Sequence, residues 1–521
     1  PRFDTYGFTG QQAFYDLVLE VDPSNDEKLF TGGVDIFSSV NGGNSWSQTS
    51  VWTPVAVALP VVHADQHAVV FGPGNKLLFG NDGGVYFSND YGATVPSRNK
   101  GFNVTQFYSL GVSPTTNGLP GDNFVAGAQD NGSQMFTNAT PGPNTSVEVQ
   151  GGDGAYSMFD QDGTDRYRIT NYVYNDRINL FNYATSTTRS INFESGSTGS
   201  NGAFIAPMAL DSRLDILYSD YAKGANIIVR RYKNIKSGTI QKAPLTNALL
   251  NSAATALTVS PFPPTTGSTS TLLIGTRSGR LLKVINADNG TTTAGSAVGW
   301  SNITGPDFVG SISDVEYGSS ENEIYVTFHN YNVASVWYTN NGGITWQNKE
   351  GDLPDLPVKC ILRNPLNAGE VIIGTDLGVW ASSNFTSASP TWTRSDNGMQ
   401  NVRVTDLDLR NDNMVYAATY GRGIFSGLFT AATLGTTNFK NDLLVNVYPN
   451  PSDGQITIKI NEYNGKVNLQ VVDLNGRVVH SLNDSGFNVE KSINLENLQS
   501  GIYILKMNGE GFGYTKKIIL K

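Results

Sequence analysis

The fold of this chain is decided by a short unit whose clearest copy is Leu78-Phe79-Gly80-Asn81-Asp82-Gly83-Gly84-Val85-Tyr86-Phe87-Ser88. Two apolar runs flank a turn that contains glycine, and the second run ends in a hydroxyl side chain. Apolar runs of this length on either side of such a turn are typical of two antiparallel strands. The unit therefore predicts a β-hairpin.

The unit recurs along most of the chain. Its nine copies cover residues 29–38, 78–88, 125–136, 169–180, 217–229, 273–282, 324–337, 373–380 and 418–425. Successive copies begin about 44 to 55 residues apart, close to the ~40 to 50 residues of a β-propeller blade. We therefore expect an all-β fold with a multi-bladed β-propeller of about eight to nine blades over residues 1–426. A single ring and the C-terminal part of a larger double propeller, with its first half upstream of Pro1, both remain open.

Three copies continue into a turn motif of the form S-x-D-x-G-x-[ST]-W, the Asp-box. The instances are Ser39 to Trp46, Thr339 to Trp346, and Ser88 to Val95, which lacks the Trp. The polar side chain can bond its own turn, and Gly accepts a positive φ. We interpret these turns as structural staples rather than as catalytic groups.

Strand order sorts the motifs between the two faces of a propeller. In an up-and-down blade, the turn between the second and third strands lies on the same face as the start of the first strand. The Asp-box turns then fall on the lower face. The upper face receives the Gly-centred turns and the segments that enter each first strand.

The segment His63-Ala64-Asp65-Gln66-His67 directly precedes a first-strand run. In an extended backbone, His63, Asp65 and His67 would point the same way. Imidazole and carboxylate groups together could bind a divalent metal ion or act as acid and base. The alternative is a hydrogen-bonded turn that locks two blades.

Further candidates gather on the upper face. We expect Asp82 and Asp130 to be the catalytic pair if the protein is an enzyme, since paired carboxylates supply general acid and base or nucleophile. The ligand-binding candidates are Asp65, Gln129, Asn131, Asp153, Asp376, Arg277 and Arg422. Because Asp beside Gly is common in tight turns, a structural role is open for Asp82, Asp130 and Asp153.

A second acidic segment, Asp160-Gln161-Asp162-Gly163-Thr164-Asp165, has the spacing of a calcium loop. No bidentate Glu follows it at the position that such loops use. The favoured interpretation is a solvated hairpin tip.

The series HxDxH, GNDGGVY, Gln106-Phe107-Tyr108, AxQDNG and GGDG, in this order over residues 60–155, resembles a group of bacterial Asp-box (BNR repeat) propeller proteins. Members are labelled sialidase-like, glycosyl-hydrolase-like or sortilin-like. The resemblance implies the propeller fold, and the names given to the group do not define an activity. Sialidases hold a carboxylate of the substrate with three arginines. In this chain the arginines in rim turns are Arg277, Arg280 and Arg422, and they cannot be assembled into such a triad. Xyloglucanase-type double propellers use two Asp residues across a cleft, which Asp82 with Asp130 or Asp376 could imitate.

The end of the chain carries different motifs. They are Tyr448-Pro449-Asn450-Pro451, Leu469 to Val479, Leu498 to Lys506, and Lys516 to Lys521. Apolar residues alternate with polar ones, and Asn475-Gly476 separates two such runs, which predicts a small Ig-like β-sandwich. Motif order and spacing resemble the type A C-terminal sorting domain of the Bacteroidetes type IX secretion system. We place this domain at residues 442–521, after a linker at residues 427–441.

The second resemblance implies where the protein acts and which partners export it. The family passes through the periplasm and the outer-membrane secretion machinery, and a sortase-like peptidase removes the sorting domain. The product is either released or anchored to lipopolysaccharide. We therefore expect an extracellular or cell-surface protein.

Composition excludes several classes of function. The net charge of −10 and the pI near 5.0 leave no basic stripe for a nucleic-acid partner. No apolar run reaches the ~18 residues of a transmembrane helix. The single cysteine, Cys360, cannot form an internal disulfide and is expected in the core. The chain begins at Pro1 without a signal peptide, so we expect either that one has been removed or that an upstream piece is missing.

Three hypotheses for function follow. The first is a secreted or surface-displayed monomeric propeller that binds an extracellular ligand, most simply a polysaccharide, at its upper rim. The second is an extracellular glycoside hydrolase that uses paired rim carboxylates. The third is a surface adhesin or protein-interaction scaffold.

Overall fold

The computed structural model describes residues 7–54, 58–142, 144–194, 201–262, 269–289, 298–395, 398–431, 445–474, 476–509 and 512–521. The chain divides into two compact units, Pro1–Thr430 and Ala431–Lys521. Secondary structure in the described ranges is β-strand apart from three short 3-10 turns, η1 (Thr115–Asn117), η2 (Val173–Asn175) and η3 (Ala287–Asn289). The protein is therefore all-β, as expected.

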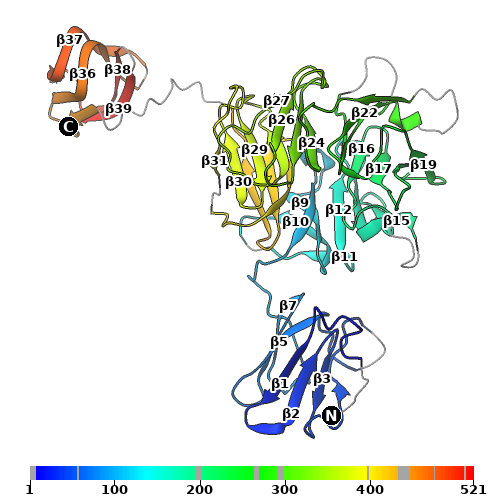
Figure 1. Ribbon diagram of the computed structural model, residues 1–521. Helices are drawn as coiled ribbons and strands as arrows, with labels where there is room; N and C mark the ends of the chain where they lie inside the picture. The colour runs from blue at the N-terminus through cyan, green and yellow to red at the C-terminus, as the bar shows by residue number, and fades with distance from the viewer. Residues whose placement is uncertain are drawn as a thin grey trace. The chain divides into compact units, whose positions relative to one another are not determined.

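Small antiparallel sheets in strict chain order build the first unit (Figure 1). The first two sheets are β1 (Val18–Asp22), β2 (Asn25–Gly32), β3 (Ile36–Ser39) and β4 (Ser47–Gln48), then β5 (Gln66–Phe71), β6 (Leu77–Asn81) and β7 (Gly84–Ser88). We call these the two-sheet group.

Seven further sheets follow along the chain, and we call them the seven-sheet group. The first three are β8 (Phe107–Val112), β9 (Asp122–Ala128), β10 (Gly132–Ala139) and β11 (Val147–Gln150); β12 (Gly154–Phe159), β13 (Tyr167–Tyr172), β14 (Arg177–Asn182) and β15 (Thr187–Phe193); and β16 (Met208–Asp211), β17 (Ile216–Asp220), β18 (Val229–Lys233) and β19 (Gln241–Leu245). The next two are β20 (Ala254–Val259), β21 (Leu272–Thr276), β22 (Leu281–Ile285) and β23 (Gly299–Asn302); and β24 (Ile312–Tyr317), β25 (Ile324–Phe328), β26 (Val336–Thr339) and β27 (Gln347–Asn348). The last two are β28 (Val358–Arg363), β29 (Val371–Thr375), β30 (Gly378–Ser382) and β31 (Thr393–Arg394); and β32 (Val404–Leu409), β33 (Met414–Thr419) and β34 (Ile424–Leu428).

Each of the nine repeats predicted from the sequence is an antiparallel pair formed by the second and third strands of one sheet. The predicted hairpins are therefore confirmed. The turns that follow the third strands also have the predicted local bonds. In one of them, Asn41 Oδ1 accepts a hydrogen bond from Ser45 N at 2.9 Å, and Ser39 Oγ accepts one from Gly43 N at 2.9 Å.

Packing divides these sheets into the two groups. Within the seven-sheet group each sheet contacts the next, the second and third through buried side chains such as Tyr167 and Met208, and the last sheet contacts the first through β32 and β8. Leu110 N donates to Asp406 Oδ2 and Val112 N to Asp408 Oδ2, both at 2.8 Å, across that last junction. This arrangement fits a β-propeller. The first two sheets pack on each other through Phe30, Phe79 and their neighbours.

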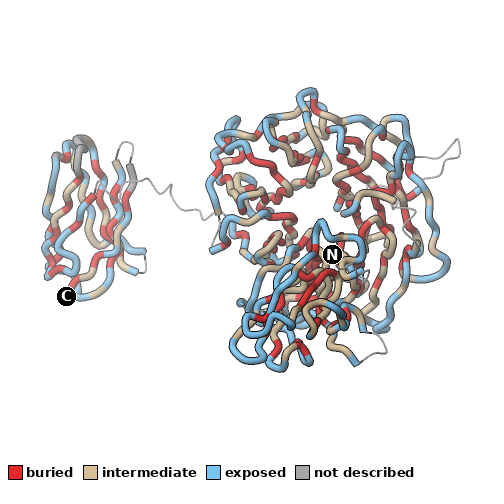
Figure 2. Tube along the Cα trace, turned by 60° about the horizontal axis from the view of Figure 1, so that its bottom comes forward, coloured by how far each residue is buried: buried red, intermediate tan, exposed pale blue. Residues whose placement is uncertain are grey.

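Burial follows the same division. The second strands β17, β21, β25 and β29 are buried at every residue, because sheets cover both of their faces. In β6 burial alternates, and Leu78 is 42% exposed. Figure 2 shows the buried residues toward the interior of the seven-sheet group and the exposed ones on its outer loops.

The second unit is a five-stranded antiparallel assembly with its own core. Its strands are β35 (Val445–Tyr448), β36 (Gln455–Val472), β37 (Val478–Asn494), β38 (Gly501–Gly509) and β39 (Phe512–Leu520). The predicted alternation holds at Ile456, Ile458 and Ile460, which are all buried, whereas Leu474 is 72% exposed. The predicted hairpin joins β36 to β37, although Asn475 lies outside the described residues.

The first and last segments of this unit are joined by hydrogen bonds. Asn450, in the Tyr-Pro-Asn-Pro opening, donates from Nδ2 to Lys517 O at 2.8 Å and accepts from Ile519 N at 2.9 Å. Ser452 N donates to Ile519 O at 2.9 Å. The opening motif and the basic, apolar final strand therefore stabilise each other.

The boundary of the first unit lies slightly later than the sequence predicted. Gly427 and Leu428 belong to β34, and Phe429 is buried against Leu407 and Val415. The residues from 432 to 444 lie outside the described ranges. At least three residues of the predicted linker, 427–429, therefore belong to the first unit.

Candidate functional site

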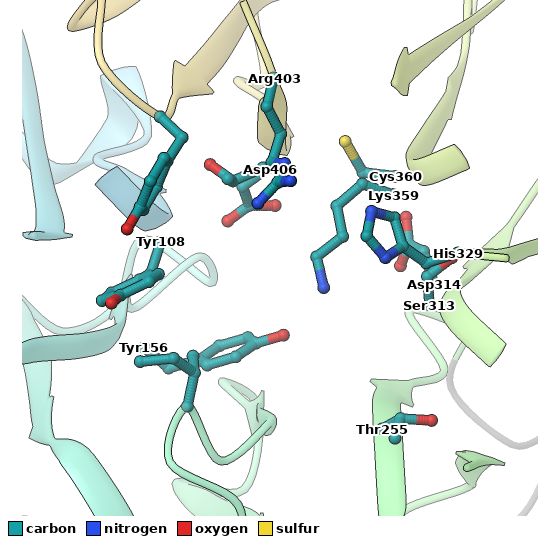
Figure 3. Close-up of a pocket in the computed structure, with 13 residues that line it drawn as sticks. Tyr108, Tyr156, Thr255, Ser313, Asp314, His329, Lys359, Cys360, Arg403 and Asp406 are labelled. Atoms are coloured by element: carbon teal, nitrogen blue, oxygen red, sulfur yellow. The ribbon is translucent and has the colours of Figure 1, made fainter. Parts of the chain in front are cut away.

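A polar cavity of about 250 Å³ lies where the first strands of the seven-sheet group converge (Figure 3). Its walls include residues of β8, β12, β20, β24, β28 and β32, together with Ile205 before β16. All seven sheets are therefore represented around one hollow, the sheet β16–β19 only by the segment that leads into β16. The repeated topology brings these strands together, because each of them occupies the same edge position in its own sheet.

Most of these first strands carry a β-bulge near their start. The extra residue is Tyr108 in β8, Thr255 in β20, Ser313 in β24, Lys359 in β28 and Thr405 in β32. A bulge turns the extra side chain out of the regular alternation. All five of these side chains line the cavity.

The bulge hydroxyls also join neighbouring sheets. Thr255 Oγ1 donates to Ile312 O at 2.6 Å, and Thr405 Oγ1 donates to Phe107 O at 2.8 Å. Ser313 Oγ donates to Val358 O at 2.6 Å. These bonds fix the first strands around the cavity and give its wall a defined shape.

Charged and phenolic groups supply the chemistry of the cavity. In Figure 3 the Lys359 ammonium and the Tyr156 hydroxyl both point toward its centre. Asp314 Oδ2 accepts a hydrogen bond from Ile361 N at 2.9 Å, while burial raises the pKa of Asp314 to about 6. Burial also raises the pKa of Asp406 well above its usual range, which favours its neutral form. The cavity thus offers both donors and acceptors.

Cys360 lines the same cavity and is buried, as its sequence context predicted. Burial raises the pKa of its thiol well above the usual value. The thiolate is therefore disfavoured, and Cys360 is a packing residue rather than a nucleophile.

Two residues predicted from the sequence do not line this cavity but bond residues that do. Gln129 Oε1 accepts hydrogen bonds from Tyr108, at 2.9 Å, and from Tyr420. Asp376 Oδ1 pairs with Arg403 Nε at 2.8 Å and with His329 Nε2 at 3.2 Å. Burial and the charge of Lys359 lower the pKa of His329, which leaves the imidazole neutral at pH 7.

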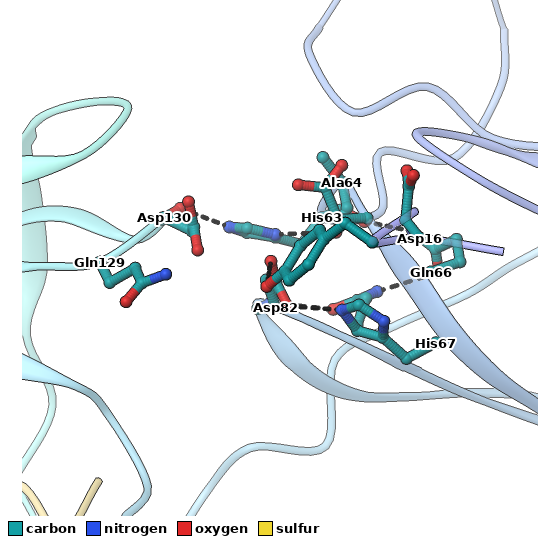
Figure 4. A network of polar contacts seen from close by, with 12 residues as sticks. Asp16, His63, Ala64, Gln66, His67, Asp82, Gln129 and Asp130 are labelled. Carbon is teal, nitrogen blue, oxygen red and sulfur yellow. Dashed lines mark hydrogen bonds and ion pairs between the residues drawn. The ribbon is translucent and has the colours of Figure 1, made fainter. Parts of the chain in front are cut away.

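The other predicted candidates form a separate carboxylate cluster where the two-sheet group contacts the turn after β9 (Figure 4). His67 Nε2 donates to Asp82 Oδ1 at 2.8 Å, and Tyr15 Oη donates to Asp82 Oδ2 at 2.8 Å. His67 is the bulge residue of β5, so it occupies the position that lines the cavity in the seven-sheet group. Asp82 therefore has both oxygens fixed by neighbours.

The main chain of Asp130 forms hydrogen bonds with both groups of sheets. His63 Nε2 lies 2.8 Å from Asp130 O, and it must donate because a carbonyl only accepts. Asn131 Nδ2 donates to Asp82 O at 2.9 Å. Asp130 N donates to Asp153 Oδ1 at 3.0 Å.

The cluster perturbs its own carboxyl groups. Burial, Asp153 and Asp82 raise the pKa of Asp130 to about 7. Burial, Asp16 and Asp82 raise the pKa of Asp65 to about 6. Burial and the bond to Asp82 raise the pKa of Tyr15. Like charges in one partly dry site cause these shifts.

The three candidate metal ligands do not share one extended strand. Asp65 has a φ of 65° and its Oδ1 accepts from Gln12 Nε2 at 2.6 Å, whereas His63 and His67 bond Asp130 and Asp82. Within the described ranges, no three His, Cys, Asp or Glu side chains are grouped so that they could hold a metal ion by themselves. The side chains serve the contact between sheets in this structure.

Arg277 and Arg422 are exposed in rim turns, as expected. Arg277 N donates to Ala253 O at 3.0 Å, and Arg422 O accepts from Asn103 Nδ2 at 2.6 Å. Neither residue lines the cavity. The residues predicted to share one rim therefore fall into three sets. One set bonds the lining of the cavity, the second forms the carboxylate cluster, and the third consists of these two arginines.

Sequence reasoning missed Lys359, Arg403, His329, Tyr156 and Tyr420. A signal for the cavity was present in Ser313-Asp314-Val315-Glu316 and Thr405-Asp406-Leu407-Asp408, where polar residues alternate with apolar ones in first strands. Such a strand presents apolar side chains on one face of its sheet and polar side chains on the other. The bulges themselves leave no mark in the sequence.

Comparison with known proteins identifies the end of the chain. Residues 446–521 match the family model of the secretion system C-terminal sorting domain. This segment is therefore a type IX sorting domain, and the protein is exported to the cell surface or the extracellular space. No helix among the described residues is long and apolar enough to cross a membrane.

The remainder of the chain is less clearly related to known proteins. No curated protein matches it. Among solved structures, the crystal structure of the computationally designed Ika8 protein is similar with a TM-score of 0.40 and 15% identity, over 70% of this chain and 96% of that one.

Proposed function

We propose that this exported protein binds an extracellular carbohydrate at the mouth of its central cavity, on a seven-bladed β-propeller formed by residues 107–428. The carrying observation is the cavity itself, around which all seven sheets of the seven-sheet group are represented. Its volume of about 250 Å³ is near the lower end of the ~300–1,000 Å³ of ligand sites, so one sugar unit is the largest group we expect inside.

The lining suits a sugar. Hydroxyl groups of a sugar both donate and accept hydrogen bonds, and the cavity presents Lys359, Tyr156 and Asp314 for these roles. Aromatic rings of Tyr108 and Tyr420 stand at the mouth, with centroids 5.8 Å apart. Such rings offer apolar faces for the C–H faces of a sugar ring.

A glycan array with the purified protein tests this proposal. We expect binding to a defined set of glycans, and a loss of about tenfold or more in affinity for Lys359→Met, which removes the central ammonium. Lys76→Met is the matched control, because Lys76 is an exposed lysine of the two-sheet group that does not line the cavity. An inert array, or full binding by Lys359→Met, would refute the cavity as the carbohydrate site.

A glycoside hydrolase is the second candidate, and one observation favours it. Asp82 and Asp130 lie in one cluster, and the pKa of Asp130 is raised to about 7. A carboxyl group that holds its proton near neutral pH can serve as a general acid beside an ionised partner. Under this reading Asp130 is the acid and Asp82 the base or nucleophile.

The two candidates separate experimentally. If the protein hydrolyses a glycan, Asp82→Asn and Asp130→Asn should each abolish turnover while glycan binding persists. Lys359→Met should retain turnover if the carboxylate cluster is the active site. Turnover that survives both Asn substitutions would remove these carboxylates from the mechanism.

A further inference from the structure

One buried carboxylate in the first unit lacks any partner in the structure. Asp160 follows β12 directly and is 0% exposed, and neither of its carboxylate oxygens accepts a hydrogen bond. No lysine, arginine or histidine of the described residues forms an ion pair with it; Lys236 pairs with Asp165 and Asp215 instead. An isolated buried carboxylate costs several kcal/mol, so a group of this kind calls for a compensating charge.

The groups that act on Asp160 are a second carboxylate and a hydroxyl, both of which can offer oxygen atoms to a cation. The Asp162 carboxylate and the Ser212 hydroxyl lie beside it and act on its pKa, which burial and Asp162 raise to about 7. Thr164 N donates to Asp162 Oδ1 at 2.7 Å, and Gln161 N donates to Ser212 Oγ at 2.9 Å. Asp162 is thus held by its own loop, and Ser212 is held by the loop that carries Asp160.

A second unpartnered oxygen belongs to Asn117 of η1. Asn117 is 1% exposed, and its Oδ1 has no hydrogen bond. Its Nδ2 lies 3.5 Å from the main-chain oxygen of Asp160. Three unsatisfied acceptor atoms therefore belong to two adjacent buried residues, contributed by neighbouring sheets.

We propose that Asp160 and Asp162, with neutral oxygens from Ser212 and Asn117, bind a calcium ion that joins the loops of three successive sheets. Oxygen-only ligands of mixed charge suit Ca²⁺, which takes six to eight oxygens in flexible geometry, better than softer metals. Two carboxylates without a bidentate Glu indicate weak binding, with a Kd of about 10⁻⁴ to 10⁻³ M, as in other extracellular modules. The site does not depend on the carbohydrate proposal.

The sequence had favoured a solvated hairpin tip for the segment from Asp160 to Asp165. The structure agrees for Asp162 and Thr164, which are exposed, but not for Asp160, which is fully buried. A hairpin tip has no reason to bury a charge. This burial distinguishes the segment from an ordinary turn.

The test uses the full chain after treatment with EDTA and dialysis into chelator-free buffer at pH 7.5. Bound ⁴⁵Ca²⁺ is measured by equilibrium dialysis, and the melting temperature is followed as Ca²⁺ is raised to about 5 mM, with Mg²⁺ in parallel. We expect saturable calcium binding and a rise in melting temperature, both lost in Asp160→Asn. Asp165→Asn is the matched control, because Asp165 lies in the same loop but pairs with Lys236; it should keep both effects.

Two results would overturn the proposal. One is the absence of calcium binding by the wild-type chain, and the other is an unchanged calcium response in Asp160→Asn, which would place any ion elsewhere. If Asp160→Asn does not fold, Asp162→Asn provides the same test, because Asp162 is exposed and its replacement leaves the core intact. In that case retention of the full calcium response by Asp162→Asn counts against the site.

Discussion

At the scale of single residues, the environment rather than the residue type decides what each carboxyl group can do. The two carboxylate oxygens of Asp82 accept hydrogen bonds from His67 and Tyr15. Asp130 is instead partly buried and lies near two further carboxylates, those of Asp153 and Asp82. The sequence presents both as Asp beside Gly in equivalent turns. Only the neighbouring side chains make the chemical environments of these two carboxyl groups different.

The raised pKa of Asp130 makes stability depend on pH. In the unfolded chain the pKa of an Asp is about 3.9, whereas in the folded chain the pKa of Asp130 is about 7. The folded state therefore binds the proton more tightly, and this contribution to stability, present at pH 4, is lost as the pH rises through 7. We expect Asp130→Asn to flatten the fall in melting temperature between pH 5 and 8.

Thermal melts at several pH values check this expectation. Asp307→Asn is the control, since Asp307 is an exposed carboxylate and its replacement should leave the profile of the wild type. A profile for Asp130→Asn that parallels the wild type would show that Asp130 titrates normally in the folded protein.

At the scale of elements, glycine marks the places where one sheet lies against the next. A Cβ at Gly127 would stand 1.8 Å from Ala155 O of the following sheet, and a Cβ at Gly275 would stand 2.4 Å from Ile312 Cγ2. Gly80 occupies the same position in its repeat, yet a Cβ there would meet only Ala68 of its own sheet, at 3.4 Å. Among the described residues, no other sheet therefore covers the face of β5–β7 at Gly80.

Equivalent substitutions at these two glycines should have opposite effects. Gly127→Ala forces β9 away from β12 and should destabilise the protein by about 3 kcal/mol or more, because backbone cannot yield as a side chain can. Gly80→Ala should be neutral or stabilising by about 0.5 kcal/mol, since Ala restricts the unfolded chain. Denaturant unfolding of both variants measures the difference; equal effects would show that Gly80 is also covered by a neighbour.

At the scale of the whole molecule, two units with separate cores carry two separate tasks. Residues 446–521 are the sorting domain, and the first unit ends at Thr430. The hydrophobic core of the second unit is formed by its own strands alone. We therefore expect export and the proposed ligand binding to be separable by mutation.

Deletion of residues 431–521 should abolish export without unfolding the first unit. We expect the truncated protein to be absent from the cell surface and the medium in fractionated cultures, because the secretion machinery recognises the missing domain. Its melting transition should match that of the first unit in the full chain. Surface display of the truncated protein would contradict this assignment of tasks.

Much of the fold could be read from the chain. The nine hairpins, the bonded Asp-box turns and the motifs of the sorting domain all depend on local periodicity and turn chemistry, which neighbours in sequence fix. The division of the nine sheets into groups of seven and two could not be read, because the repeats look alike whether or not another sheet covers them. Gly80 and Gly127 illustrate this, with the same local sequence pattern and different surroundings.

The candidate site shows the same limit. Gln129 and Asp376, which the sequence placed in turns, bond residues that line the cavity, but Lys359 and Tyr156 reach the cavity from within strands. The sequence by itself determined the strands, their turns and the route of export, because these depend on residues close together in the chain. Only the tertiary structure decided which side chains meet in the cavity and which buried charge lacks a partner, because both depend on bulges and on packing between sheets far apart in sequence.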